Sequence, residues 1–197
     1  VQVLKSDFIA LWKNSKAFWS LFFASALITG NWFLYIWAVN TNHLVETSLG
    51  YYINPLISVL LGIFFLKERL TAAQKLAFVI ALVGVIILTI SYGRFPWLAF
   101  ALAISFAIYG LMKKTIPLDA VRGLTIETLF IVPFALIYYI YLFVTNQAIM
   151  FHDSLQTDLL LVLTGLATAI PLVLFAKGAQ RMPLYMIGFL QYIAPTC

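Results

Sequence analysis

Long stretches without a charged side chain dominate the sequence. Seven of them contain no Asp, Glu, Lys or Arg: 17–45, 47–66, 76–93, 95–112, 128–152, 159–176 and 182–197. The first six hold at least 18 residues each, and a helix needs about 20 apolar residues to cross the hydrocarbon core of a bilayer. The pattern therefore predicts six membrane-spanning helices, with a seventh that begins near Met182.

The basic residues fall on alternate connections between these stretches. They precede the first stretch and follow the second, fourth and sixth: Lys5, Lys13, Lys16, Lys67, Arg69, Lys75, Lys113, Lys114, Arg122, Lys177 and Arg181. Arg94 is the one exception. Because basic loops stay in the cytoplasm, these connections are predicted to be cytoplasmic, and the loop with His152 and Asp153 external. A nucleic-acid-binding surface would not alternate in this way, so no nucleic-acid partner is expected.

Composition agrees with a chain whose solvent is lipid. Hydrophobic residues make up 63% of the 197 residues, charged residues only 10%, and the mean hydropathy is +1.01. We predict an all-α, polytopic transmembrane helical bundle with about seven spans. The chain opens at Val1 without an initiator Met and stops inside an uncharged stretch, so we expect a piece of a longer protein.

Cysteine and histidine give no support for metal or redox chemistry. Cys197 is the single cysteine, which excludes an internal disulfide. His43 and His152 have no second His or Cys at ligand spacing, so neither a metal nor a cofactor is expected.

Helix punctuation supports the boundaries of the spans. Thr71 with Gln74 has the pattern of a capping box, Pro96 and Pro183 suit the start of a helix, and Asp119 is a candidate cap. Four further prolines lie inside uncharged stretches: Pro55, Pro133, Pro171 and Pro195. They predict either helices broken beside a cavity or simple packing kinks.

A short internal repeat links two of these prolines. Residues 51–55 (YYINP) recur as 191–195 (QYIAP). The alternation of basic loops places the start of the first copy outside and the start of the second inside. Repeats of opposite orientation are typical of secondary transporters, whose substrate site lies near the midplane between the halves.

Several separate motifs resemble a known family. The runs 48–56 (SLGYYINPL) and 66–71 (LKERLT), with Gln74, Gly84 and Val85, are similar to the EamA module of the drug/metabolite transporter superfamily. Further runs are similar to its RarD-like branch: 31–32 (NW), 36–40 (IWAVN), 105–106 (SF), 109–111 (YGL), 124–128 (LTIET) and 191–196 (QYIAPT). Lys67 and Ala77 depart from the family pattern, which often has Gly at these positions.

The resemblance implies ten spans arranged as two inverted five-helix repeats. On this basis 1–94 corresponds to the C-terminal part of the first repeat, spans 3–5. Residues 95–197 then correspond to the N-terminal part of the second repeat, spans 6–9, the last one truncated. It also implies a multi-pass carrier of small metabolites or drug-like solutes in the cytoplasmic membrane of a bacterium, completed by the missing helices. The oligomeric state is not indicated.

Candidate site residues come from the repeat and from charges near the apolar stretches. The predicted substrate cavity contains Tyr51, Tyr52, Asn54, Pro55, Gln191, Tyr192 and Glu127. A possible outer gate contains Trp37, Asn40 and Glu46. Each has a structural alternative: packing for the aromatic and amide side chains, an interfacial belt for Trp37, and a first-turn acid for Glu46. The alternative for Glu127 is also a first-turn acid, with Thr125 as the helix cap.

Two other functional classes compete with a carrier. A membrane-embedded enzyme would need paired carboxylates or a nucleophile with a base, and Glu127 has no evident partner in the sequence. A receptor or scaffold without transport activity would share the composition. Solute uptake by vesicles separates these classes.

Overall fold

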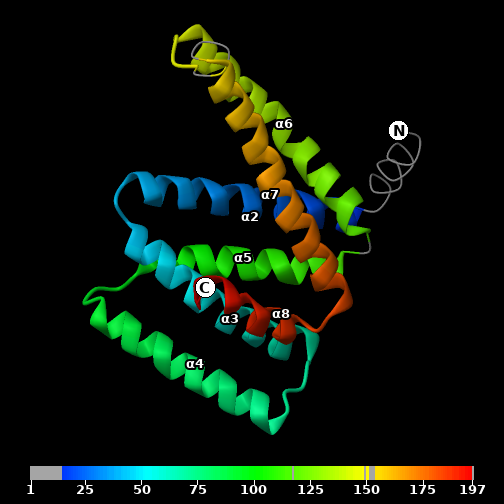
Figure 1. The fold of residues 1–197 in the computed structure, drawn as a ribbon. Helices are drawn as coiled ribbons and strands as arrows, with labels where there is room; N and C mark the ends of the chain where they lie inside the picture. The colour runs from blue at the N-terminus through cyan, green and yellow to red at the C-terminus, as the bar shows by residue number, and fades with distance from the viewer. Residues whose placement is uncertain (1–14, 117, 149, 151–153, 197) are drawn as a thin grey trace. The chain divides into compact units, whose positions relative to one another are not determined.

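The computed structural model describes residues 15–116, 118–148, 150 and 154–196, and the elements within them are helices (Figure 1). In chain order they are α2 (Ser15–Asn40), α3 (Leu44–Leu66), α4 (Ala72–Ser91), α5 (Trp97–Thr115), α6 (Ala120–Val144), α7 (Leu155–Arg181), α8 (Leu184–Gln191) and α9 (Ile193–Thr196). The predicted external residues His152 and Asp153 lie outside the described residues.

The predicted number of complete spans is confirmed for this part of the chain. Among the described residues, six helices, α2 to α7, are long and apolar enough to cross a membrane. The shortest has 19 residues, which corresponds to roughly 28 Å at 1.5 Å per residue and so matches the hydrocarbon core. The last uncharged stretch forms α8 and the short α9.

Local sequence signals fix several helix ends. Thr71 and Gln74 form the predicted capping box at the start of α4, with each side chain bonded to the backbone N–H of the other residue. Asp119 caps α6 by accepting from the Val121 N–H. Pro96 and Pro183 lie directly before α5 and α8, as their missing N–H groups favour.

The structural alternative for Glu127, a first-turn acid with Thr125 as the cap, is wrong, whereas the candidate cap Asp119 is confirmed. Because Asp119 starts the helix, α6 begins at Ala120, and Glu127 lies two turns inside it. The Thr125 hydroxyl donates to the Val121 carbonyl within the helix, so Thr125 does not act as a cap. The uncharged stretch 128–152 does not locate the start of α6, because a helix can extend beyond the apolar stretch into charged residues at its cytoplasmic end.

Most of the prolines inside the uncharged stretches do not interrupt a helix. Pro55, Pro133 and Pro171 lie within the continuous helices α3, α6 and α7. The helix does end before the fourth proline, since α8 stops at Gln191 and α9 starts at Ile193. The broken-helix alternative is therefore wrong for α3, α6 and α7, and the helix is interrupted only before Pro195 among the described residues.

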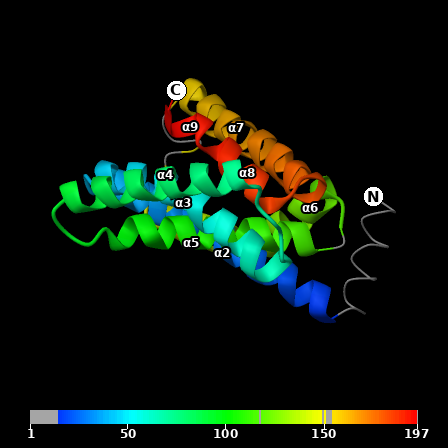
Figure 2. The same cartoon turned by 90° about the horizontal axis from the view of Figure 1, so that it is seen from below.

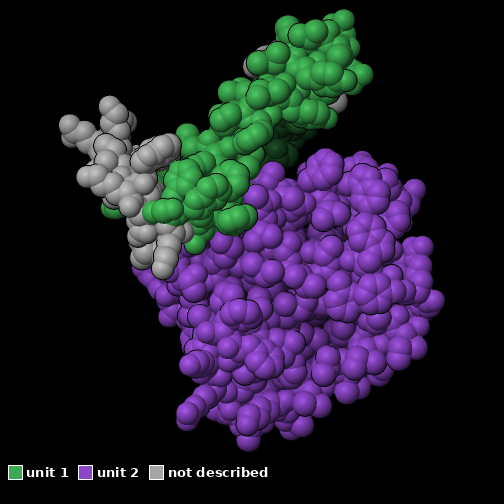
Figure 3. All heavy atoms as spheres, turned by 180° about the vertical axis from the view of Figure 1, so that it is seen from behind, with its two compact units in different colours: residues 1–25, 117–177 green, residues 26–116, 178–197 purple. Residues whose placement is uncertain are grey.

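The chain divides into two compact units, coloured in Figure 3. The second unit, residues 26–116 and 178–197, has α3 at its centre. This helix packs against α5, α8, α4 and α9, and Figures 1 and 2 both show α3 between its neighbours. A buried apolar cluster joins α3 to α4 and α5: Leu49, Ile53, Leu56, Val85, Ala99 and Ala103.

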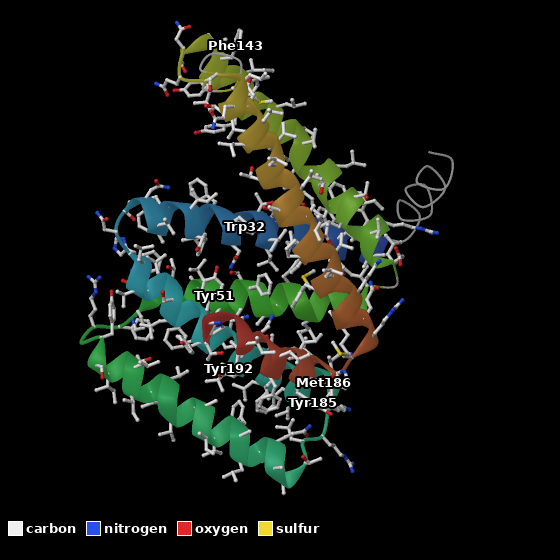
Figure 4. All side chains as sticks on the ribbon, viewed as in Figure 1. Trp32, Tyr51, Phe143, Tyr185, Met186 and Tyr192 are labelled. Atoms are coloured by element: carbon white, nitrogen blue, oxygen red, sulfur yellow. The ribbon has the colours of Figure 1, made fainter. Side chains whose placement is uncertain are left out.

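The first unit consists of residues 1–25 and 117–177. The beginning of α2 packs against α6, where Phe130 makes edge-to-face contacts with Phe18 and Phe22 at 5.2 and 5.9 Å between ring centroids. The Ser25 hydroxyl donates to the Glu127 carbonyl at 2.7 Å. Phe143 lies at the other end of α6 (Figure 4).

Candidate functional site

The two proline-containing motifs meet where α3 crosses α8. The Asn54 side chain on α3 donates from Nδ2 to Gln191 Oε1 at the end of α8, at 3.0 Å. Asn54 is only 8% exposed, and its Oδ1 accepts no hydrogen bond from the described residues. A buried amide with one unused acceptor is costly in a protein interior, so this oxygen is a candidate for binding a donor group.

The equivalent tyrosines of the two motifs exchange hydrogen bonds. The Tyr52 hydroxyl donates to the Pro195 carbonyl at 2.8 Å, and the Tyr192 hydroxyl donates to the Tyr52 carbonyl at 3.2 Å. Figure 4 shows Tyr192 at the C-terminal end of α8. Each copy of the motif therefore supplies a donor to the backbone of the other copy.

A glycine allows the two helices to approach closely at this crossing. A Cβ atom on Gly188 of α8 would lie 2.8 Å from the Pro55 carbonyl oxygen and 3.0 Å from Val59 Cγ2 of α3. Since the Pro55 carbonyl oxygen is a backbone atom that cannot move without shifting α3, a residue with a Cβ does not fit this contact. Gly188 therefore sets the depth at which α8 lies against Pro55.

Tyr51 differs from the other residues of its motif. Its side chain is 49% exposed, and its ring contacts Tyr35 of α2 at 6.0 Å between centroids. It therefore lies on a different side of α3 from the contact with α8. The structure brings together five of the predicted cavity residues at this crossing: Tyr52, Asn54, Pro55, Gln191 and Tyr192. Tyr51 is adjacent to Tyr52 in sequence but does not take part in the crossing.

Glu127 belongs to the first unit and is 2% exposed. Its place two turns inside α6 makes it a buried ionisable residue of a spanning helix. Such residues are expensive in a membrane and are often functional. A role for Glu127 in a substrate cavity stays a prediction.

The predicted outer gate residues lie at one end of α2 and α3. The Trp37 ring stacks on His43 at 5.6 Å and is 41% exposed, while the Asn40 amide donates to the Ile36 carbonyl of its own helix. Glu46 lies in the first turn of α3, as its structural alternative predicted, and is 2% exposed. A gating function for these residues stays a prediction.

Arg94, the exception to the charge alternation, pairs with this buried acid. Its guanidinium lies 3.2 Å from Glu46 Oε1, which also accepts from the Tyr92 hydroxyl at 2.7 Å. Hydrogen bonding to Tyr92 and then the Glu46 charge raise the pKa of Arg94 above its ordinary value. The one basic residue on the predicted external side is thus explained by a local partner.

Two polar contacts of this unit were missed by the sequence analysis. Asn31 of α2 donates to the Leu102 carbonyl and to the Ser105 hydroxyl of α5 at 2.9 and 2.8 Å. Glu68 binds the start of α8 through its carboxylate. A signal for Glu68 existed, because it is an acid between two uncharged stretches where the other charged residues, Lys67, Arg69 and Lys75, are basic.

Metal chemistry receives no support from these contacts. Within the described ranges, no group of three or more His, Cys, Asp or Glu side chains converges in a way that could hold a metal ion. The donors and acceptors at the α3–α8 crossing are amides, phenols and backbone carbonyls. Such groups suit binding of a neutral or amphipathic solute and are poor candidates for acid–base catalysis.

Comparison with known proteins agrees with the motifs. Residues 4–90 match the EamA-like transporter family. A Bacillus subtilis protein named uncharacterized transporter YojE is 54% identical over 184 residues, covering 93% of this chain and 61% of the relative. Protein RarD of Escherichia coli is 43% identical over 173 residues, covering 88% of this chain and 58% of the relative. The chain is therefore similar to the EamA-like transporter family over residues 4–90 and to these longer relatives over most of its length.

These relatives are longer than this chain. Chloramphenicol-sensitive protein RarD of Pseudomonas aeruginosa is a more distant relative, at 30% identity over 94% of this chain and 65% of its own length. The chain thus spans about three fifths of the length of these curated relatives. No solved structure matches the chain.

Proposed function

We propose that the whole protein is a permease or exporter that moves small metabolites or drug-like solutes across the cytoplasmic membrane of a bacterium by alternating access. The observation that carries this proposal is the crossing of α3 and α8, where matched motifs pair through Asn54 and Gln191 and exchange tyrosine hydrogen bonds. A site between two related helices of opposite orientation is the arrangement expected of an inverted-repeat carrier.

The proposal includes two inverted five-helix repeats, with the boundary after residue 94. The similarity of 51–55 to 191–195 and the alternation of basic loops support this division. Ten spans would require helices beyond the six to seven of this chain, and the greater length of the relatives is consistent with that requirement. The missing helices are then intramolecular partners of the exposed apolar faces.

The groups at the crossing favour a neutral, amphipathic substrate with a hydrogen-bond donor. Tyr52 and Tyr192 supply aromatic surface, and Asn54 Oδ1 supplies a buried acceptor that is unpaired among the described residues. A hydroxyl or amide N–H of a solute would satisfy this acceptor. Rearrangement of the Asn54–Gln191 pair during the transport cycle would expose it.

Reconstitution of the full-length protein into liposomes tests the proposal. Uptake of a panel of radiolabelled neutral amphipathic solutes is measured, beginning with chloramphenicol because one relative is named for sensitivity to it. Asn54→Ala and Gln191→Ala each remove a hydrogen bond worth about 1 kcal/mol, so KM should rise about fivefold with near-normal expression. Thr89→Val is the matched control, since the Thr89 hydroxyl bonds only within α4, to the Val85 carbonyl.

The outcomes separate carrier, enzyme and scaffold. Saturable uptake of an unchanged solute that weakens in the Asn54 and Gln191 variants supports the carrier. Chemical conversion of the solute would instead indicate a membrane enzyme, and absence of both uptake and conversion across the panel would favour a receptor or scaffold. If uptake occurs but both variants retain the parental KM, the substrate does not bind at this crossing.

A further inference from the structure

The Glu68 carboxylate, just beyond the end of α3, caps the start of α8. Oε1 accepts from the Leu184 N–H at 2.8 Å and Oε2 from the Tyr185 N–H at 3.0 Å. Figure 4 shows Tyr185 at this end of α8. The first amides of a helix lack carbonyl partners within it, and a negative charge there is favoured by the helix dipole. The contact joins residues 116 and 117 positions apart.

The chain around Glu68 leaves room for this contact. A Cβ atom on Gly62 would lie 2.6 Å from Glu68 Oε2 and 3.3 Å from the Tyr185 nitrogen, so a side chain there would displace the carboxylate. Lys67 turns the backbone with a φ of 56°, and the Glu68 N–H then bonds to the Gly62 carbonyl at 3.1 Å. The turn after α3 thereby directs the carboxylate toward α8.

A lysine from a third segment completes the cluster. Lys114 near the end of α5 lies with Nζ 3.8 Å from Glu68 Oε1 and donates to the Met182 carbonyl just before α8. The side chains of Glu68 and Lys114 are only 12% and 22% exposed. The partners of the carboxylate among the described residues are Lys114, Leu184 and Tyr185. All three follow residue 94 and so belong to the proposed second repeat, whereas Glu68 belongs to the first.

We propose that Glu68 is a latch that closes the cytoplasmic end of the α3–α8 interface and is released once in each transport cycle. The inference rests on the proposed function, because alternating access requires contacts between the repeats at one end to break when that end opens. The basic residues of the α3–α4 connection assign this end to the cytoplasm. The structure therefore represents the state closed at that end, and loss of the carboxylate charge should favour opening.

The test measures the opening directly in the full-length protein, reconstituted in liposomes with its native cysteines replaced. Spin labels at Lys75→Cys on α4 and Arg181→Cys at the end of α7 report the distance across this end by pulsed electron paramagnetic resonance. Both positions are exposed and belong to the second unit. Glu68→Gln keeps the shape and removes the charge, so the ratio of long-distance to short-distance populations should rise about tenfold.

Two further variants make the test specific. Lys114→Met leaves the Glu68 carboxylate bound to the N–H groups of α8 but removes its ionic partner. The population of long distances should therefore rise, but by less than in Glu68→Gln. Asp119→Asn is the control, because Asp119 also accepts from a helix N–H, but only within its own segment. It should leave the distance distribution unchanged.

The readout distinguishes a latch from a structural contact and from failure of the proposed function. A lower melting temperature with unchanged distances in both Glu68→Gln and Lys114→Met would overturn the latch. A distance shift without uptake of any solute would support Glu68 as the contact that closes this end, but would count against transport and against release in a transport cycle. Uptake by the parent protein without a distance shift in the variants would overturn the latch and leave transport standing.

Discussion

At the scale of single residues, Lys67 occupies a backbone conformation that favours glycine. It ends α3 in the left-handed region, with φ 56° and ψ 32°, and its N–H caps the helix by bonding to the Gly62 carbonyl. An L-residue with a Cβ is strained there by roughly 1–2 kcal/mol, whereas glycine adopts the conformation freely. This chain keeps a lysine and accepts that strain.

Replacing Lys67 by glycine should therefore stabilise the protein. After subtraction of the extra unfolded-state entropy of glycine, the expected gain is about 0.5–1 kcal/mol. Thermal unfolding of the purified full-length protein in detergent measures the change. Lys67→Ala removes the same charge and stem but keeps the Cβ strain, so it should show no gain; equal stabilisation by both variants would point to the charge instead of the backbone.

At the scale of helices, the crossing of α3 and α8 depends on a small residue at the point of contact. Pro55 is buried on α3, and its carbonyl oxygen faces Gly188 of α8. Because α3 is continuous through Pro55, this proline does not break the helix. It lies instead at a close contact between the two helices. The contact between α3 and α8 thus has a hydrogen bond near each end of α8. Asn54 binds Gln191 at the C-terminal end, and Glu68 binds Leu184 at the N-terminal end.

Gly188→Ala should force α8 away from α3. The added Cβ would lie 2.8 Å from the Pro55 carbonyl oxygen, so overpacking should cost roughly 1–3 kcal/mol in stability and weaken the Asn54–Gln191 bond. Thermal unfolding together with the uptake assay measures both effects. Gly84→Ala on α4 is the matched control, because its Cβ would meet nothing within 4 Å among the described residues, and it should be tolerated.

At the scale of the whole chain, most apolar surface of the long helices is unburied within each unit. The most weakly buried spans are α4, α6 and α7. Such surface is unstable in water but suits lipid or further helices of the same protein. The second unit is held by a few polar contacts at its helix ends and crossings, notably Glu46 with Arg94 and Glu68 with α8.

The topology is tested by thiol labelling of single cysteines in intact cells. Asn146→Cys, in the connection after α6, should react with a membrane-impermeant reagent, because that connection is predicted to be external. Arg69→Cys, between α3 and α4, should react only after the membrane is made permeable. Reaction of both positions from the same side of intact cells would contradict the alternation of basic loops.

The sequence by itself determined the spans, many helix ends and the resemblance to EamA proteins. Bilayer thickness requires long uncharged stretches, and caps such as Thr71 with Gln74 act over three or four residues, so both are readable along the chain. The repeat of 51–55 at 191–195 also placed Asn54 and Gln191 in one candidate site before any contact was known. These features depend on local order or on similarity between segments.

Only the tertiary structure decided which polar atoms pair across the chain. The hydrophobic pattern does not predict that Glu68 binds Leu184 or that Asn31 binds Ser105, because a helix can rotate about its axis without any change in that pattern. For the same reason, the sequence does not show which neighbour Tyr51 of α3 faces. In the structure its ring contacts Tyr35 of α2, while α3 packs against α8 elsewhere. Hydrogen bonds depend on helix rotation and separation to within a few tenths of an ångström, and close contacts such as that of Gly188 with Pro55 set both.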